Sequence, residues 1–126
     1  MSADFIVDPP GKRLPDFLDW MPPRGLLRMV LELVAEEIDD EAVAASLREF
    51  VAGGYAFFAL SNYSATQAAA IMKVIREKLP AAAWEWFPDS ESARGVVEEL
   101  VEMVEEAEAA PPGVTKRPDF RRGASG

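Results

Sequence analysis

Carboxylates are the side chains of this sequence best placed to form a catalytic pair, because the chain contains no histidine and no cysteine. Their absence removes the commonest general base, the thiol nucleophile and every Ser–His or Cys–His mechanism. Asp16 with Asp19 and Glu36 with Asp39 have the spacing of neighbours on a helix. A glycosidase-type pair must instead face across a cleft, with the pKa of one member raised. The two pairs therefore favour solvated or capping roles, and we predict that the protein is not an enzyme.

A divalent cation is the other ligand that acidic residues suggest. Glu32, Glu36, Asp39 and Asp40 cluster around the end of one predicted helix. No histidine and no glycine-bearing calcium loop accompanies them, so the pattern favours a solvent-facing surface over a metal site. The sequence also lacks the GxxxxGK[S/T] and GxGxxG phosphate-binding motifs. We predict no metal and no cofactor.

Charge and composition restrict the class of partner. The chain has 126 residues, of which 49% are hydrophobic, and a formal net charge of -9. That length is typical of one globular domain, and the negative charge repels nucleic-acid backbones. The N-terminus has no basic region followed by a long apolar run, and no apolar run is long enough to span a bilayer. We expect a cytoplasmic protein that binds another protein, with no nucleic acid and no membrane; self-association into a homo-oligomer remains compatible with the sequence.

Apolar residues recur at helical spacing in four segments, which we predict to be helices over residues 24–38, 41–51, 64–79 and 91–109. Asp39 or Asp40 is expected to cap the second helix. Ser64 and Gln67 match the S-x-x-Q capping box at the start of the third, and Pro80 is expected to end that helix. Strand signals are confined to Phe5-Ile6-Val7. The predicted fold is all-α, a compact bundle of four principal helices.

Three further segments complete the predicted domain organisation. Residues 53–60 form an uninterrupted apolar run, predicted to be a buried connector that the helices enclose. Residues 1–21 read as an irregular N-terminal arm of a single domain over residues 1–110. Residues 111–126 read as a flexible tail, with Lys116, Arg117, Arg121 and Arg122 against one acid, Asp119. We expect this tail to fold back along the acidic last helix or to lie on an acidic partner.

Candidate partner-binding residues are the aromatic and charged side chains that no core stripe requires. Tryptophans concentrate binding energy at interfaces, although they are also common in cores, so both roles stay open for them. The acidic face of the last helix and the basic tail offer complementary charge. The candidates are Trp20, Trp84, Trp86, Glu98, Glu102, Glu105, Phe120 and Arg121.

A family resemblance suggests a more specific function. Phe5-Ile6-Val7-Asp8 with Gly11-Lys12, the prolines at 15, 22 and 23, the following leucine-rich helix, and an acidic helix before a Pro-Gly tail resemble the small tail assembly chaperones of long-tailed bacteriophages. The resemblance implies a non-catalytic protein that keeps the apolar tape-measure helix soluble, with no active-site residues to transfer. The chain departs from that family in having one plausible strand at its start. An alternative from another class is an immunity protein or antitoxin, whose acidic faces would occlude a basic toxin surface.

Overall fold

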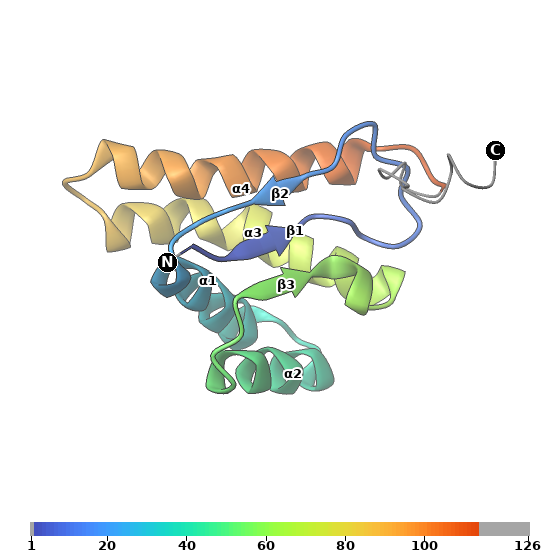
Figure 1. Ribbon diagram of the computed structural model, residues 1–126, viewed down its shortest axis with the longest axis horizontal. Helices are drawn as coiled ribbons and strands as arrows, with labels where there is room; N and C mark the ends of the chain where they lie inside the picture. The colour runs from blue at the N-terminus through green and yellow to red at the C-terminus, as the bar shows by residue number, and fades with distance from the viewer. Residues whose placement is uncertain (1, 114–126) are drawn as a thin grey trace.

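Four helices and a small sheet make up the fold of the described residues. The computed structural model describes residues 2–113, and Figure 1 shows their arrangement. The chain is mostly helical, as predicted, but the all-α prediction is wrong in part because a three-stranded sheet is present. In chain order the elements are β1 (Asp4–Ile6), β2 (Asp19–Trp20), α1 (Arg24–Glu37), α2 (Glu41–Ala52), β3 (Phe57–Ala59), a 3-10 turn (Leu60–Asn62), α3 (Ala65–Trp86) and α4 (Glu91–Ala109).

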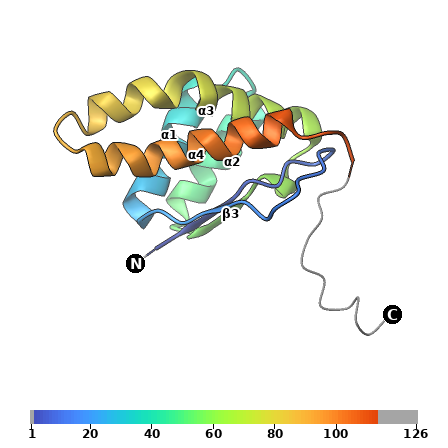
Figure 2. The ribbon, with the colours of Figure 1, turned by 90° about the horizontal axis from the view of Figure 1, so that it is seen from above.

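The helix starts follow the local sequence signals. The Asp40 carboxylate accepts hydrogen bonds from the amides of Ala42 and Val43, and so caps α2. Ser64 and Gln67 form the predicted capping box, which satisfies free amides at the start of α3. Ser90 caps α4, whose bounds coincide with the prediction. Figure 2 shows α3 and α4 lying side by side.

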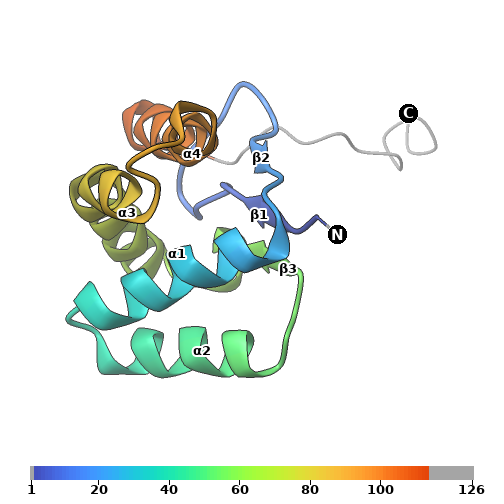
Figure 3. The ribbon, with the colours of Figure 1, turned by 90° about the vertical axis from the view of Figure 1, so that its left-hand side faces the viewer.

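The sheet has the order β2-β1-β3, so β1 is central. β1 pairs antiparallel with β2, with Phe5 opposite Trp20, and parallel with β3, with Phe5 opposite Phe58. These three aromatic side chains are buried, and the ring centroid of Phe5 lies 4.9 Å from that of Phe58 and 6.4 Å from that of Trp20. In Figure 3 the four helices lie to the left of the strands and below them, so only one face of the sheet carries the main core.

The N-terminal segment is therefore an integral part of the core, and the prediction of an irregular arm is wrong for this region. Phe5, Val7 and Leu14 are fully buried. Trp20 is only 2% exposed, and its indole Nε1 donates a hydrogen bond to the carbonyl oxygen of Val96 on α4 at 2.8 Å. The segment that was expected to pack loosely instead supplies the central strand of the sheet.

Residues 53–60 were predicted to be a buried connector, and this holds for only part of the run. Phe58 is 3% exposed, whereas Phe57 is 60% exposed and Tyr55 is 66% exposed. Successive side chains of a strand point to opposite faces, so β3 places Phe58 in the core and Phe57 on the outside. The connection leaves α2 through Gly54, whose φ of 68° is readily accessible only to glycine.

Pro80 lies inside α3, so the prediction that it ends the helix is wrong. The residues after it, Ala81, Ala82 and Ala83, are the strongest helix formers. Leu79 and Ala83 are buried on either side of the proline, which is itself exposed. Packing of this last part of α3 therefore outweighs the backbone hydrogen bond that proline cannot donate.

The end of α4 is tied to the connection between β1 and β2. The Lys12 ammonium donates to the carbonyl oxygens of Glu108 at 2.8 Å and Ala110 at 3.2 Å. The Arg13 amide donates to the Pro111 carbonyl, and the Gly113 amide donates to the Gly11 carbonyl. Residues 111–113 thus join the folded body, although the tail was predicted to begin at residue 111; residues 114–126 lie outside the described part. Within residues 2–113 no helix is long and apolar enough to cross a bilayer.

Candidate functional site

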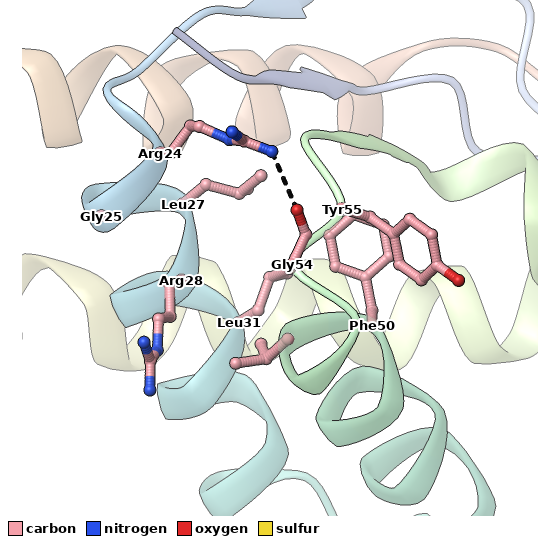
Figure 4. A pocket seen from close by; sticks show the side chains of 9 residues that line it. Arg24, Gly25, Leu27, Arg28, Leu31, Phe50, Gly54 and Tyr55 are labelled. Atoms are coloured by element: carbon pink, nitrogen blue, oxygen red, sulfur yellow. Dashed lines mark hydrogen bonds between the residues drawn. The ribbon is translucent and has the colours of Figure 1, made fainter. Parts of the chain in front are cut away.

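A groove between the start of α1 and the end of α2 could hold a ligand. Its cavity volume is about 330 Å³. Figure 4 shows the side chains around it, with Arg24 reaching towards the Gly54 carbonyl. The lining combines apolar and aromatic groups with two guanidinium groups: Arg24, Gly25, Leu27, Arg28, Leu31, Phe50, Val51, Gly54 and Tyr55.

The floor and one wall of the groove follow from the packing of α1 on α2. Leu27 and Leu31 belong to the buried stripe of α1 and form an apolar floor. The Phe50 and Tyr55 rings lie in contact, with centroids 5.6 Å apart, and form an aromatic wall. A side chain at Gly53 would collide with the Tyr55 ring, so the glycine allows that ring to lie over the end of α2. Arg24 donates a 2.9 Å hydrogen bond to the Gly54 carbonyl and closes this end.

The groove continues along the two helices into a second hollow of about 280 Å³. Arg28, Leu31 and Val51 line both hollows, so the two form one surface. The second hollow adds Arg48, whose guanidinium donates to the Ala35 carbonyl at 3.3 Å near the end of α1. Arg28 pairs with Glu32 at 3.2 Å, an exposed contact of small energetic value. We call this surface the α1–α2 groove; it combines an apolar floor with a rim that carries Arg24, Arg28 and Arg48.

Sequence reasoning did not find this groove, although one signal for it is present. Arg24 and Arg28 occupy the first two turns of α1. A helix N-terminus carries partial positive charge and favours acidic side chains, so cations there oppose the helix dipole. Local preferences that conflict with the fold often mark functional surfaces. The two arginines also stand out in a chain with a net charge of -9.

The predicted partner-binding residues do not form one site. Trp20 lies in the core, as described above. Trp84 is 60% exposed, and the Arg94 guanidinium covers one face of its ring at 3.8 Å from the centroid. Arg94 also donates to the Phe87 carbonyl, so the pair closes the turn between α3 and α4. Trp86 is half-buried and makes an edge contact with Phe87.

The remaining predicted residues concern charge. Glu98, Glu102 and Glu105 are exposed on α4, as an acidic surface requires. Phe120 and Arg121 lie outside the described residues. The structure therefore supplies an acidic helix face, but the tryptophan that contacts α4, Trp20, is buried and adds no exposed aromatic group to it.

The carboxylates that make contact differ from the pairs suggested by the sequence. Asp19 faces Asp4 on the neighbouring strand instead of Asp16. Burial raises the pKa of Asp19 from 3.8 to about 6, and a hydrogen bond with Asp4 and the negative charge of that residue add to the shift. Oδ1 of Asp19 is buried without a hydrogen-bond partner. Within residues 2–113, no three acidic side chains converge in a way that would hold a metal ion.

In comparisons with known proteins, no family model, no curated protein and no solved structure matches the chain. Its function must be argued from its surfaces.

Proposed function

We propose that this chain is a non-enzymatic protein-binding module that holds an amphipathic helix of its partner in the α1–α2 groove. The observation that carries the proposal is the combination of an apolar floor, at Leu27 and Leu31, with the arginine rim of the groove. Amphipathic helices bind in this way, with residues at helical spacing buried in an apolar groove between helices of the receptor.

The chemistry of the rim defines the partner more closely. Arg24, Arg28 and Arg48 border the groove, whereas Glu32 is the one acidic residue among its lining residues. A client helix with an apolar face and acidic flanks would complement this rim, and complementary charge favours encounter and fixes orientation. Arginine also forms planar paired hydrogen bonds with carboxylates, which adds specificity.

A phage tail assembly chaperone-like role is the specific form of this proposal. The client would then be the apolar tape-measure helix, which needs cover for its apolar face until the tail assembles. The groove supports the helix-binding part of this hypothesis, and tape-measure and tail-tube genes next to the coding sequence would support the phage part.

The alternative, an immunity protein or antitoxin, depends on a different surface. Glu98, Glu102 and Glu105 lie exposed on α4 and would complement a basic toxin surface. A toxin gene beside the coding sequence would favour this alternative. The two proposals therefore predict partners of opposite charge, an acidic one for the α1–α2 groove and a basic one for α4.

The test begins with a pull-down from the native host and identification of the partner by mass spectrometry. Calorimetry then compares binding of the partner's helical segment to the wild type and to Arg24→Glu/Arg28→Glu. We expect the reversal of these two charges to weaken binding at least about tenfold, or roughly 1.4 kcal/mol. The matched control is Lys73→Glu/Lys78→Glu on α3, which changes net charge equally but lies outside the groove lining.

The control variant should bind almost as tightly as the wild type. Equal losses in the two double variants would show that net charge alone drives binding and would contradict the groove proposal. Loss of binding in Glu98→Lys/Glu102→Lys, with the arginine variant unaffected, would favour the immunity-type function instead.

A further inference from the structure

The outer face of the sheet, opposite the helices, is a second surface with the properties of a binding site. Phe5, Trp20 and Phe58 point into the core, so by alternation their neighbours point outward. Asp4 and Ile6 of β1, Asp19 of β2 with the following Met21, and Phe57 and Ala59 of β3 share this side. Figure 1 looks onto the strands from this side, and none of the four helices crosses in front of them. We call this surface the outer sheet face.

The accessible part of the outer sheet face carries two large exposed hydrophobic groups next to Asp4. Ile6 and Ala59, which are paired partners, are buried but do not belong to the main core. Phe57 and Met21 are 60% and 66% exposed. They lie on either side of Asp4, because Asp4 pairs with Phe57 of β3 and the register of β1 with β2 places Met21, the residue after β2, opposite Asp4. Exposed apolar groups gathered on one face are typical of a binding surface.

Two carboxylates lie within this apolar surface. Asp4 and Asp19 lie close enough on neighbouring strands for the negative charge of Asp4 to help raise the pKa of Asp19, and Oδ1 of Asp19 is buried without a partner. Within residues 2–113, no lysine or arginine forms a salt bridge with either one. A ligand that complements this face therefore needs a guanidinium or ammonium group beside an aromatic or aliphatic side chain.

The chain itself contains a segment of this composition. Residues 114–126 include Lys116, Arg117, Arg121 and Arg122 against the single acid Asp119, and Phe120 lies directly before two arginines. We propose that residues 114–126 dock on the outer sheet face, with Phe120 against Met21 and Phe57 and with Arg121 or Arg122 at the Asp4–Asp19 carboxylates.

The point of attachment brings this segment within reach. Gly113 is hydrogen-bonded to Gly11, in the connection that follows β1. Gly11 is seven residues from Asp4, a span of at most about 23 Å at 3.3 Å per residue. Phe120 follows Gly113 by seven residues and can extend roughly 23 Å. The length of the segment therefore allows Phe120 to reach Met21 and Phe57 beside Asp4.

The acidic face of α4, where the tail was expected to fold back, offers the segment charge alone. Among residues 2–113 the exposed large hydrophobic side chains are Phe17, Met21, Tyr55, Phe57 and Trp84, and none of them belongs to α4. Exposed ion pairs contribute about 0–1 kcal/mol each, which does not by itself hold a short segment in place. The outer sheet face combines charge with an apolar contact for Phe120, and for this reason we prefer it.

A spin label tests the proposal in the full chain. Because the sequence contains no cysteine, Ala124→Cys provides a single attachment point for a nitroxide. In ¹⁵N-labelled protein we expect the largest loss of amide signal intensity at residues 4–6, 19–21 and 57–59, and a smaller loss at Glu102 and Glu105 on α4. The loss should be relieved by Phe57→Ser but not by Tyr55→Ser, which removes a similarly exposed ring from the α1–α2 groove.

Several results would overturn the proposal. Signal loss on α4 without loss on the strands would place the segment on the acidic helix. No loss on either surface would show that the segment does not dock. Docking onto a second copy of the chain is tested with a mixture of spin-labelled ¹⁴N protein and ¹⁵N-labelled wild type, which has no cysteine and no spin label. Loss of signal at the strands in that mixture would mean that the segment binds a second copy.

Discussion

Replacement of Phe58 and of Phe57 by alanine tests how β3 divides its side chains between the core and the outside. Phe58 is 3% exposed and packs against Phe5, Phe50 and Tyr63, with ring centroids 4.9, 5.2 and 5.8 Å away. Truncation of such a buried ring to alanine costs about 3–5 kcal/mol, since it removes the transfer free energy and leaves a cavity. Phe57 is 60% exposed, so Phe57→Ala should change the free energy of unfolding by less than about 1 kcal/mol.

Urea denaturation followed by circular dichroism measures both variants. A domain of this size is stable by roughly 5–15 kcal/mol, so Phe58→Ala removes a large share of the total. Phe58→Leu keeps most of the apolar volume and gives a measurable transition if the alanine variant does not fold; we expect a loss of roughly 1–2 kcal/mol for it. Similar losses for Phe57→Ala and Phe58→Ala would refute the alternation of β3. So would a Phe58→Leu variant as stable as the wild type.

Two other predictions concern Asp19 and Lys12. In a chain ending at Gly113, the raised pKa of Asp19 means that its stabilising contribution is complete below pH 3.8 and is lost as pH rises through about 6. Asp19→Asn should therefore be more stable than the parent at pH 7 by on the order of 1 kcal/mol after solvent screening, and equal to it near pH 4, as urea midpoints at the two pH values would show. Lys12→Met removes the donor to the Glu108 and Ala110 carbonyls and should cost about 1–2 kcal/mol, whereas exposed Lys73→Met should cost less than about 0.5 in the same assay.

The helices could be predicted from the sequence because the signals that start and maintain them are local. Asp40, Ser64 and Ser90 each lie at the helix start that their side chains cap. The apolar stripe of α1, including Leu27 and Leu31, is buried as its spacing predicted. Pro80 is the exception. Proline usually ends a helix, but burial of the residues on both sides of Pro80 keeps α3 helical through it.

The sheet could not be predicted in the same way because its pairing is not local. β2 has two residues and β1 and β3 have three each, too short for a clear period of two. Phe5 pairs with Phe58 across more than fifty residues of chain, and only that pairing shows which aromatic side chains face the core. Trp20 was predicted to bind a partner for the same reason, because the local sequence does not show that its indole is buried against α4.

The candidate site could not be predicted from the sequence either, because the groove forms only when α1 and α2 pack together. Phe50 and Tyr55 come from the end of α2 and the connection after it, and Arg24 comes from the start of α1. Nothing in the local sequence brings these three together. The one local signal for this groove is the pair of cations at the start of α1, which oppose the helix dipole.

The connection from α2 to β3 links the two proposed surfaces through one chain segment. Tyr55 lines the α1–α2 groove, Phe57 lies on the outer sheet face, and Phe58 holds the segment in the core. The Asp4 amide donates to the Ala56 carbonyl at 2.8 Å, which fixes the backbone between Tyr55 and Phe57 to the central strand. Because this segment is anchored at both Ala56 and Phe58, we expect each surface to keep its shape when a ligand binds the other. A rearrangement of the Phe58 ring would disturb the groove and the outer sheet face together.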